Sequence, residues 1–330
     1  MAAGGAGGRG SASCFAAGRP PRRIRARGRR GGRLRAHDVE TLVIANPSAG
    51  DAEHLPALAA AVARLPGRAR LVETEEAGHA EVLARRAARA GVRRIVAAGG
   101  DGTLNEVLNG IADHFERVAL GILPVGTGND FVRSVGIPAD LDEAVEVLIR
   151  GRRHRVDVAS ARVEGRRRWF LNMSAGGFSR EVDELLDAEL KSRWGPLSYI
   201  RSAAGALPEL TAHHATIEVE GEDGERERLE VDAYMVVVAN ARYVASGIPA
   251  APAARLDDGL LDLIVFPEMP LGKLVALVPR ALLGRHVEGG AVVFRRGRWL
   301  RVEAEPAIGF NADGEVLPAG VTEFEVRARV

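Results

Sequence analysis

The chain has 330 residues, enough for two domains with separate hydrophobic cores, and 46% hydrophobic with 27% charged residues is typical of a globular protein. No stretch approaches the roughly 18 apolar residues of a membrane-spanning helix. The single cysteine, Cys14, has no partner for a disulfide within this sequence and fits a reducing compartment. The net charge of +1 is unevenly spread, because residues 1–36 hold ten arginines and no acidic residue, which leaves about −9 for the remainder.

We expect residues 1–37 to form a disordered basic tail, because Gly, Ala, Arg and Ser dominate it and few residues could be buried. Three origins stay open: a start codon assigned too far upstream, a basic arm for anionic lipid or nucleic acid, and an Arg-rich transit peptide. The first is favoured, because nothing before Val39 has the pattern of a folded element.

Lysine is almost absent, since Lys191 and Lys273 stand against 43 arginines. Neither lysine lies near a glycine-rich turn, which excludes the phosphate-binding lysine of a P-loop and that of a protein kinase. A bound phosphate would have to be held by backbone amides, hydroxyl groups, arginine or a metal ion.

Short apolar segments alternate with helical patterns between residues 38 and 152. The predicted strands are 41–45, 69–73, 94–98 and 118–123, and the predicted helices are 53–65, 79–90, 104–111, 129–135 and 141–150. This alternation predicts a three-layer α/β domain, in which a parallel sheet binds ligands at the carboxyl ends of its strands.

From residue 153 to about 317 the pattern changes to strands joined by turns, which predicts a mostly antiparallel β-sandwich domain. Helices are expected near 181–190, 196–210 and 271–283. The chain is expected to return to the first domain with a last strand at about 318–330. The predicted strands are 154–162, 169–174, 216–220, 229–240, 260–266, 291–294, 299–304 and 322–330.

Three turns of the first domain follow strands that would end at the same edge of a parallel sheet, at 46–50, 99–103 and 123–131. Each offers small residues, backbone amides and a hydroxyl or amide side chain, which together suit a polyphosphate. Taken alone, each could be an ordinary turn: Asn129 could cap a helix, and Thr103 with Glu106 has the spacing of a capping box. Their matching positions favour phosphate binding.

Asp101 lies inside the glycine-rich turn, at a strand-to-helix junction where backbone N–H groups and the helix dipole attract anions. A carboxylate there would repel a phosphate unless a divalent cation stood between the two charges. The turn therefore predicts a site for a metal–nucleotide phosphate.

Six motifs occur in a characteristic order from Val39 to Val330. They are Asn46-Pro-x-x-Gly50, Gly99-Gly-Asp-Gly-Thr-x-Asn-Glu106, Leu123-Pro-x-Gly-Thr-x-Asn-Asp-Phe131, Phe170-Leu-Asn-x-x-x-Gly176-Gly-Phe178, Asp257-Asp-Gly-Leu-Leu-Asp262 and Asp313-Gly-Glu315. In this combination the chain resembles the diacylglycerol kinase catalytic domain family in its bacterial soluble form, related to sphingosine and ceramide kinases. The second motif is shared with NAD kinases and phosphofructokinases, whereas the third and last narrow the resemblance to lipid kinases.

The resemblance implies an ATP site and catalytic residues at defined positions. Asp101 would reach the catalytic Mg2+ through water, and Asp313 or Glu315 would deprotonate the acceptor hydroxyl. A structural metal would be held by Asp258 together with the backbone of Arg255 and Leu260. The implied ATP-site residues are Asn46, Ser48, Gly50, Thr74, Gly99, Gly100, Asp101, Gly102, Thr103, Asn105, Glu106, Gly126 and Thr127.

Two positions depart from the family pattern: Ala49 replaces the usual serine, and His79 stands where aspartate is common. We expect these changes to alter affinity more than activity. Without the resemblance, the turns at 257–259 and 313–315 would be interpreted as ordinary β-turns.

The resemblance implies an ATP- and Mg2+-dependent lipid kinase, with diacylglycerol as the default acceptor and phosphatidic acid as the product. Such a protein would be cytoplasmic, peripherally associated with a membrane surface and independent of nucleic acid, with a homodimer left open. Segment 271–285 could lie at the membrane or pack on the second domain, and Pro279 should kink it. The alternatives are an NAD kinase-like enzyme and a non-catalytic lipid-binding protein on the same fold.

Overall fold

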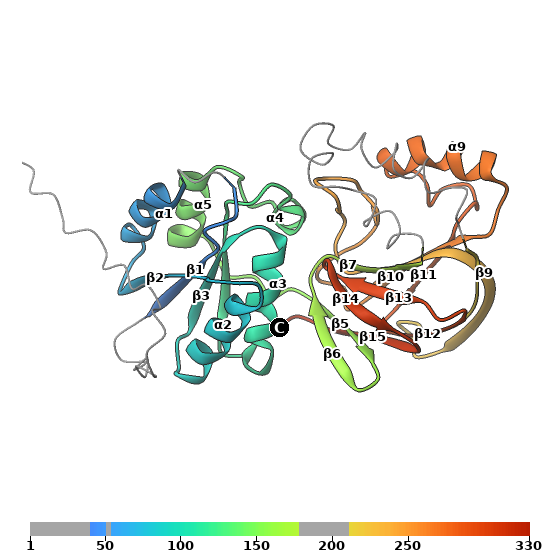
Figure 1. The fold of residues 1–330 in the computed structure, drawn as a ribbon, viewed down its shortest axis with the longest axis horizontal. Helices are drawn as coiled ribbons and strands as arrows, with labels where there is room; N and C mark the ends of the chain where they lie inside the picture. Colours follow the sequence, from blue (N-terminus) through green and yellow to red (C-terminus); the bar gives the residue numbers. More distant parts are fainter. Residues whose placement is uncertain (1–39, 51–53, 178–210) are drawn as a thin grey trace, which may run out of the picture.

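A computed structural model describes residues 40–50, 54–177 and 211–330, which form two domains side by side, with the C-terminus between them (Figure 1). The first domain lies on the left of the view, and the second, built mostly of strands, lies on the right. The expected basic tail and the predicted helices at 181–190 and 196–210 fall outside the described residues.

The first domain contains a four-stranded parallel sheet in the order β2-β1-β3-β4. The strands match the prediction to within one residue at each end: β1 (Thr41–Ala45), β2 (Ala69–Glu73), β3 (Arg94–Gly99) and β4 (Ala119–Pro124). All of β1 is buried, as a continuous apolar run predicts for a strand covered on both faces. The strand order reverses between β1 and β3, and ligands of open parallel sheets bind at such a reversal.

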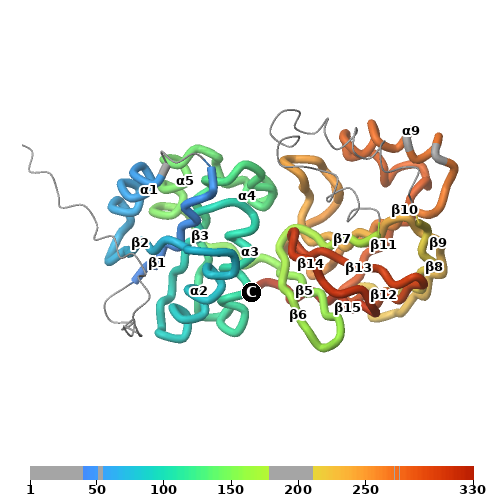
Figure 2. Tube along the Cα trace, viewed as in Figure 1, coloured from blue at the N-terminus to red at the C-terminus, as the bar shows by residue number. Residues whose placement is uncertain are grey.

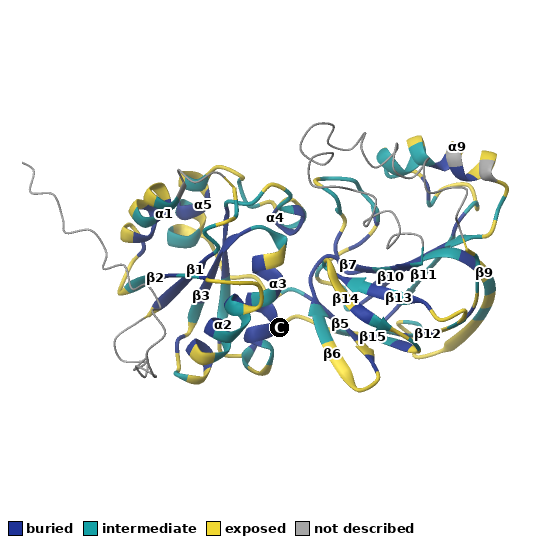
Figure 3. Cartoon of the chain, in the orientation of Figure 1, coloured by how far each residue is buried: buried dark blue, intermediate teal, exposed yellow. Residues whose placement is uncertain are grey.

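Helices cover both faces of this sheet, which confirms the predicted three layers. The helices are α1 (His54–Ala63), α2 (His79–Arg89), α3 (Asp101–Gly110), α4 (Asp130–Val135) and α5 (Leu141–Arg150). Alternate residues of β1 serve the two faces: Val43 packs in the core with α1 and α5, and Ile44 in the core with α2 and α3. The sheet is the buried centre of the domain, between helices exposed on their outer sides (Figure 3).

Helix α3 begins at Asp101, earlier than the predicted start at residue 104. The capping-box interpretation is wrong, because the Glu106 carboxylate accepts hydrogen bonds from Gly78 N (2.9 Å) and Ala80 N (3.0 Å) at the start of α2. Those N–H groups have no partner within their own helix. Glu106 therefore joins α3 to α2.

The second domain contains an 11-stranded sheet with the order β14-β13-β7-β9-β8-β12-β15-β5-β6, and β10 pairs with β9 and β11. The strands are β5 (Val158–Val163), β6 (Arg166–Phe170), β7 (Met173–Gly177), β8 (His213–Glu220), β9 (Arg226–Ala239), β10 (Leu261–Pro267), β11 (Val293–Gly297), β12 (Trp299–Glu305), β13 (Gly309–Ala312), β14 (Glu315–Ala319) and β15 (Thr322–Arg327). All pairings are antiparallel, as predicted. The sheet curls around a core in which the ring of Phe310 on β13 packs edge-on at 5.0 Å from that of Phe324 on β15.

The last strand corrects one prediction, because β15 pairs with β5 and β12 of the second domain rather than with the parallel sheet (Figure 2). The physical reason is the apolar side chain of Phe324, which is fully buried in the second core. Only the last residues return to the domain boundary, where Arg329 N donates to Asp157 Oδ1 (2.8 Å) and Val330 N donates to Val156 O (3.0 Å).

Helix α9 (Leu271–Leu282) lies on the second domain, on the side away from the first domain (Figure 1). It confirms the predicted helix near 271–283, and Pro279 stands inside it. Leu274 and Leu277 are buried, which favours packing on the second domain, whereas Leu283 just after the helix is 71% exposed. Among the described residues, no helix has the length and apolar character needed to cross a membrane.

Candidate active site

The three predicted turns meet at the carboxyl edge of the parallel sheet. Asn46, after β1, donates its N–H to Ala98 O (3.1 Å), and Val125, after β4, donates its N–H to Gly99 O (3.3 Å). Backbone hydrogen bonds thus tie the first and third turns to the end of β3, from which the second turn begins. The convergence expected from a parallel sheet is confirmed.

The first turn is held by its own side chains. Asn46 Oδ1 accepts a hydrogen bond from Ser48 N (2.9 Å), and both Ser48 and Gly50 are exposed at the edge of the sheet. Thr74, which follows β2, is nearly buried, and its N–H donates to Ala45 O (2.8 Å). The structure therefore places these four predicted residues along the same edge.

The second and third turns touch through glycine backbone. A Cβ atom on Gly126 would lie 2.7 Å from Gly100 N and nearer still to its Cα. Gly99 is equally constrained, because a Cβ there would lie 3.0 Å from Thr103 Cγ2. Gly126 is therefore needed for close packing between the two turns, and Gly99 for packing within the second turn. By contrast, a Cβ on Gly102 would meet nothing within 4 Å.

Asp101, the first residue of α3, holds the third turn in place. Its Oδ2 accepts a hydrogen bond from Asp130 N (3.0 Å), and its Oδ1 accepts one from Phe131 N (3.2 Å). The Nδ2 of Asn172, from the second domain, lies 3.5 Å from Oδ1. Asp101 therefore stands at the boundary between the domains, with a second lone pair remaining on Oδ2.

Two residues that contact Asp101 each carry a buried oxygen without a hydrogen-bond partner: Asp130 Oδ1 and Asn172 Oδ1. Burial raises the pKa of Asp130, and the charge of Asp101 adds to this rise, although the hydrogen bond from Ser246 N (3.1 Å) to its other oxygen opposes it. Carboxylate and amide oxygens are ligands for a hard divalent cation, either directly or through water. These residues therefore fit a magnesium ion.

Sequence reasoning did not select Asp130 or Asn172, although both stand inside motifs that pointed to the family. Within the described ranges, no group of three or more His, Cys, Asp or Glu side chains is placed to hold a metal ion. A cation beside Asp101 would thus need water or ligand oxygens to complete its coordination.

Asp313 lies in the turn between β13 and β14 with a left-handed backbone conformation (φ 48°). Its carboxylate accepts four hydrogen bonds, from Leu171 N (2.7 Å), Asn172 N (2.9 Å), Met173 N (3.1 Å) and Asn105 Nδ2 (3.2 Å). Burial raises the pKa of Asp313 to about 6, although these hydrogen bonds oppose the rise. At neutral pH the carboxylate is therefore mostly ionised and surrounded by donors.

The same hydrogen bonds explain why the predicted strand at 169–174 is two strands. The structure ends β6 at Phe170 and starts β7 at Met173. At the break, N–H groups that a continuous strand would give to a neighbour go to Asp313 instead. The turn between β13 and β14 is thus anchored in the β6–β7 connection.

Glu315 differs from Asp313 in its freedom to meet a ligand. Its side chain is 53% exposed, and one oxygen lies 3.8 Å from Arg168 Nη2. A carboxylate has about four lone-pair sites, and at Asp313 all four are occupied. Of the two candidate bases, Glu315 is the one whose carboxylate is not saturated by hydrogen-bond donors and whose side chain is exposed.

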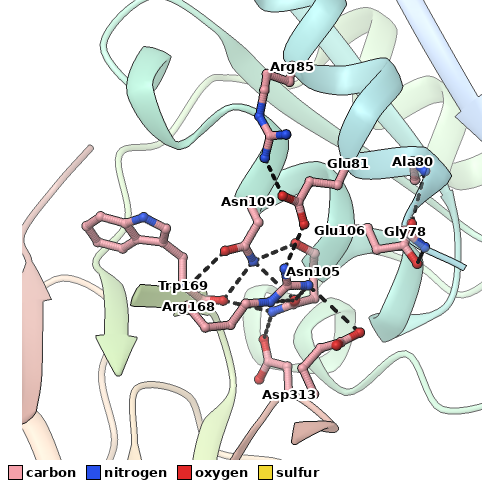
Figure 4. A network of polar contacts seen from close by, with 11 residues as sticks. Gly78, Ala80, Glu81, Arg85, Asn105, Glu106, Asn109, Arg168, Trp169 and Asp313 are labelled. Carbon is pink, nitrogen blue, oxygen red and sulfur yellow. Dashed lines mark hydrogen bonds and ion pairs between the residues drawn. The ribbon is translucent and has the colours of Figure 1, made fainter. Parts of the chain in front are cut away.

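Asn105 joins the domains through a polar network (Figure 4). Its buried side chain donates from Nδ2 to Trp169 O (2.9 Å) and to Asp313, and its Oδ1 accepts from Arg168 Nη2 (2.7 Å). The side chain of Asn105 thus contacts the second domain, and that of Glu106 the start of α2, while their expected place in the ATP site stays a prediction.

Apolar contacts also cross the domain boundary. The ring of Trp169 packs edge-on against Phe115 at 5.3 Å, and Leu171 and Val158 belong to the core cluster of the first domain. The two domains are therefore packed together on this side of the site.

The turn expected to hold a structural metal has a different arrangement. Both oxygens of Asp258 are engaged, Oδ1 by Leu260 N (3.1 Å) and Oδ2 by the guanidinium of Arg296. Arg296 also donates from Nε to Asp262 Oδ1 (2.9 Å). Arg255 pairs with Asp257 (3.2 Å). The guanidinium supplies the positive charge, so this arrangement does not fit a metal ion at Asp258.

Fold and site together define a two-domain protein. In it, the edge of the parallel sheet that carries the three glycine-containing turns lies next to the turn between β13 and β14, which carries Asp313 and Glu315. Residues 40–161 match the family described as the diacylglycerol kinase catalytic domain. Residues 173–330 match the YegS C-terminal NAD kinase beta sandwich-like domain.

Named relatives agree with these matches. A diacylglycerol kinase from Staphylococcus carnosus is 33% identical over 260 residues, 78% of this chain and 82% of the relative. One from Staphylococcus aureus is 33% identical over 255 residues, 76% and 78% of the two chains. A crystal structure of a diacylglycerol kinase from Bacillus anthracis has a TM-score of 0.68 at 28% identity, covering 88% of this chain and 94% of that one. The chain belongs to the diacylglycerol kinase catalytic domain family.

Proposed function

We propose that this protein is an ATP-dependent lipid kinase that transfers the γ-phosphate to a lipid hydroxyl, with diacylglycerol as the first acceptor to test. The observation that carries the proposal is the position of Asn172, whose backbone N–H binds Asp313 and whose side chain lies beside Asp101. The turn between β13 and β14, which carries Asp313 and Glu315, thus adjoins the turns of the first domain that suit a phosphate. The names of the relatives support the same class of reaction.

The first domain would bind the phosphates of ATP. The first N–H groups of α3 have no acceptor within the helix and carry the positive end of its dipole. Gly102 and Thr127 are exposed beside them and leave room for a phosphate group. Backbone amides and a hydroxyl would therefore bind the phosphates, which a lysine does in other phosphate sites.

Asp101, Asp130 and Asn172 would hold Mg2+, because Asp130 and Asn172 both contact Asp101 and each has a buried oxygen without a partner. The ion, when bound, would neutralise charge on the phosphates. Phosphoryl transfer depends mainly on positioning and electrostatic stabilisation. The fixed contact between Gly100 and Gly126 supports such positioning.

Glu315 is the base that the geometry favours. Its side chain is exposed, whereas the oxygens of Asp313 are bound by four N–H donors. Glu315 would accept the proton of the lipid hydroxyl, an effect of roughly 10²–10⁴-fold. Asp313 would hold the turn that presents Glu315.

The lipid would be met at a membrane surface by a cytoplasmic protein that associates peripherally. We do not expect nucleic acid to take part, and a homodimer stays a prediction. For the domains we propose an ATP-binding unit at 38–152 and a lipid-acceptor unit from 153 through the last strand. The burial of β15 in the second core supports this extension.

The test is phosphate transfer by the purified full chain from labelled ATP with Mg2+. The acceptors are diacylglycerol, phosphatidylglycerol and sphingosine in mixed micelles, and NAD in solution. Label in phosphatidic acid would support the proposal. Label only in NADP would favour the NAD kinase alternative, and lipid binding without transfer would favour the non-catalytic one. Glu315→Gln should lose activity, whereas Glu164→Gln, on an exposed turn of the same domain, should keep it.

A further inference from the structure

One arginine of the second domain reaches into the first. Arg168, on β6, has a side chain only 18% exposed, and Figure 4 shows it among residues of α2 and α3. Its Nη1 donates to Glu81 Oε2 (2.7 Å) on α2. Its Nε (3.1 Å) and Nη2 (2.7 Å) both donate to Asn105 Oδ1 on α3. The guanidinium is thus fixed by the first domain from two sides.

Arg168, together with Asn109, whose Nδ2 also donates to Asn105 Oδ1 (3.1 Å), determines which way the amide of Asn105 points. Because Arg168 carries only donors, it requires the amide oxygen on its side. The NH2 group must then face Trp169 O and Asp313 Oδ2, where it donates two hydrogen bonds. In the flipped orientation, the amide oxygen would face the carboxylate and the NH2 group would face the guanidinium, and both contacts would be repulsive.

Arg168 also lies beside Glu315, at 3.8 Å from Nη2 to Oε1. The other charged groups packed around it are Glu81, which also pairs with Arg85, and Asp313, which is reached through Asn105. One planar cation therefore acts on both carboxylates of the turn between β13 and β14. A lysine would supply one ammonium group in place of the planar set of N–H donors that contacts Glu81 and Asn105 together.

We propose that Arg168 is a positioning residue, which holds Asp313 through Asn105 and Glu315 through charge, so that the turn between β13 and β14 stays fixed against the first domain. Its role in turnover rests on the proposed phosphoryl transfer at this turn. Arg168 acts through these two carboxylates and not on the reacting atoms.

The first test follows the position of the turn without an activity assay. Hydrogen–deuterium exchange at the backbone amides of residues 171–173 reports the hydrogen bonds that they donate to Asp313. Arg168→Gln should speed exchange there, whereas Arg166→Gln, an exposed arginine on the same strand, should not. Unchanged exchange at these amides in folded Arg168→Gln would overturn the proposal.

The second test separates positioning from a loss of folding. In steady-state assays, Arg168→Gln should lower kcat by roughly 10–100-fold, the range expected for misplaced catalytic groups, with KM for ATP within about twofold of wild type. Arg168→Lys should recover part of kcat. The double variant Arg168→Gln/Asn105→Ala should lose less than the product of the two single losses, because part of the effect of Arg168 passes through Asn105. Independent, additive losses would contradict that path.

The outcomes also distinguish this proposal from the proposed function. If wild-type protein phosphorylates no acceptor, the proposed function fails, and the exchange experiment alone decides whether Arg168 fixes the turn. If wild type is active and Arg168→Gln matches both wild type and Arg166→Gln in kcat, the lipid kinase proposal stands and the positioning role is refuted.

Discussion

Two effects act on the pKa of Asp313 in opposite directions, and the free energy of unfolding at two pH values shows which effect is larger. Enclosure of the carboxyl group raises its pKa to about 6, while four N–H donors favour the ionised form. The perturbation is Asp313→Asn, which cannot ionise. The quantity to measure is the free energy of unfolding of both proteins at about pH 7.5 and about pH 5.

The expected sign follows from proton linkage. Aspartate in an unfolded chain ionises near pH 3.9. Because the pKa of Asp313 is higher in the folded protein, at about 6, the folded state binds a proton more readily between these values. The free energy of unfolding therefore rises as the pH falls through about 6. For a single site this gives about 1.4 kcal/mol between pH 7.5 and pH 5, and about 3 kcal/mol in total below pH 3.9.

Urea unfolding followed by tryptophan fluorescence would measure this change, since Trp169 lies at the domain boundary beside Phe115. Burial also raises the pKa values of Asp130 and Asp262. Those groups are present in both proteins, so the difference between wild type and Asp313→Asn isolates the one site. Asp113→Asn, on exposed surface, controls for the loss of a carboxylate.

The refuting result is a change of opposite sign. If wild type loses stability relative to Asp313→Asn as the pH falls, the four N–H donors outweigh burial, and the pKa of Asp313 lies below its ordinary value. No pH-dependent difference would mean that the two effects cancel.

Three further changes test the packing around the site. Gly126→Ala should lower the melting temperature and raise KM for ATP, because its Cβ would collide with Gly100, whereas Gly102→Ala has open space and should leave the melting temperature unchanged. Arg296→Met should cost about 3 kcal/mol by leaving the buried carboxylate of Asp262 unpaired. A chelator should not lower the melting temperature of Asp101→Asn, and a downward shift in that variant would indicate a metal in the turn at Asp258. Glu106→Ala should cost about 1 kcal/mol in urea unfolding by removing the acceptor at the start of α2, and an unchanged midpoint would contradict that contact.

The parallel sheet was predictable because its signal is local. Each strand is a short apolar run bounded by turn residues, and β1 was predicted to the residue. The convergence of the turns at 46–50 and 99–103 then followed from the geometry of any parallel sheet. The same reasoning identified Asp101 before any contact was known.

The second domain was harder, because its pairings join residues far apart in the chain. The predicted strand at 169–174 breaks only because Asp313, more than a hundred residues later, takes its N–H groups. Strands β13 and β14 were not predicted, since each is short and the residues between them suit an ordinary turn. The pattern of residues near 169–174 contains nothing that would indicate a partner as distant in the chain as Asp313.

By itself the sequence determined the class of each domain, the edge where a phosphate could bind and the motifs that carry the family. Those properties depend on residue type and spacing along a few neighbouring positions. Only the tertiary structure decided that the carboxylate of Asp313 is saturated, that Glu315 is exposed and that Arg168 joins the two domains. Hydrogen bonds and burial act through a few ångströms of space, and which side chains meet at that range is fixed only when both domains have folded against each other.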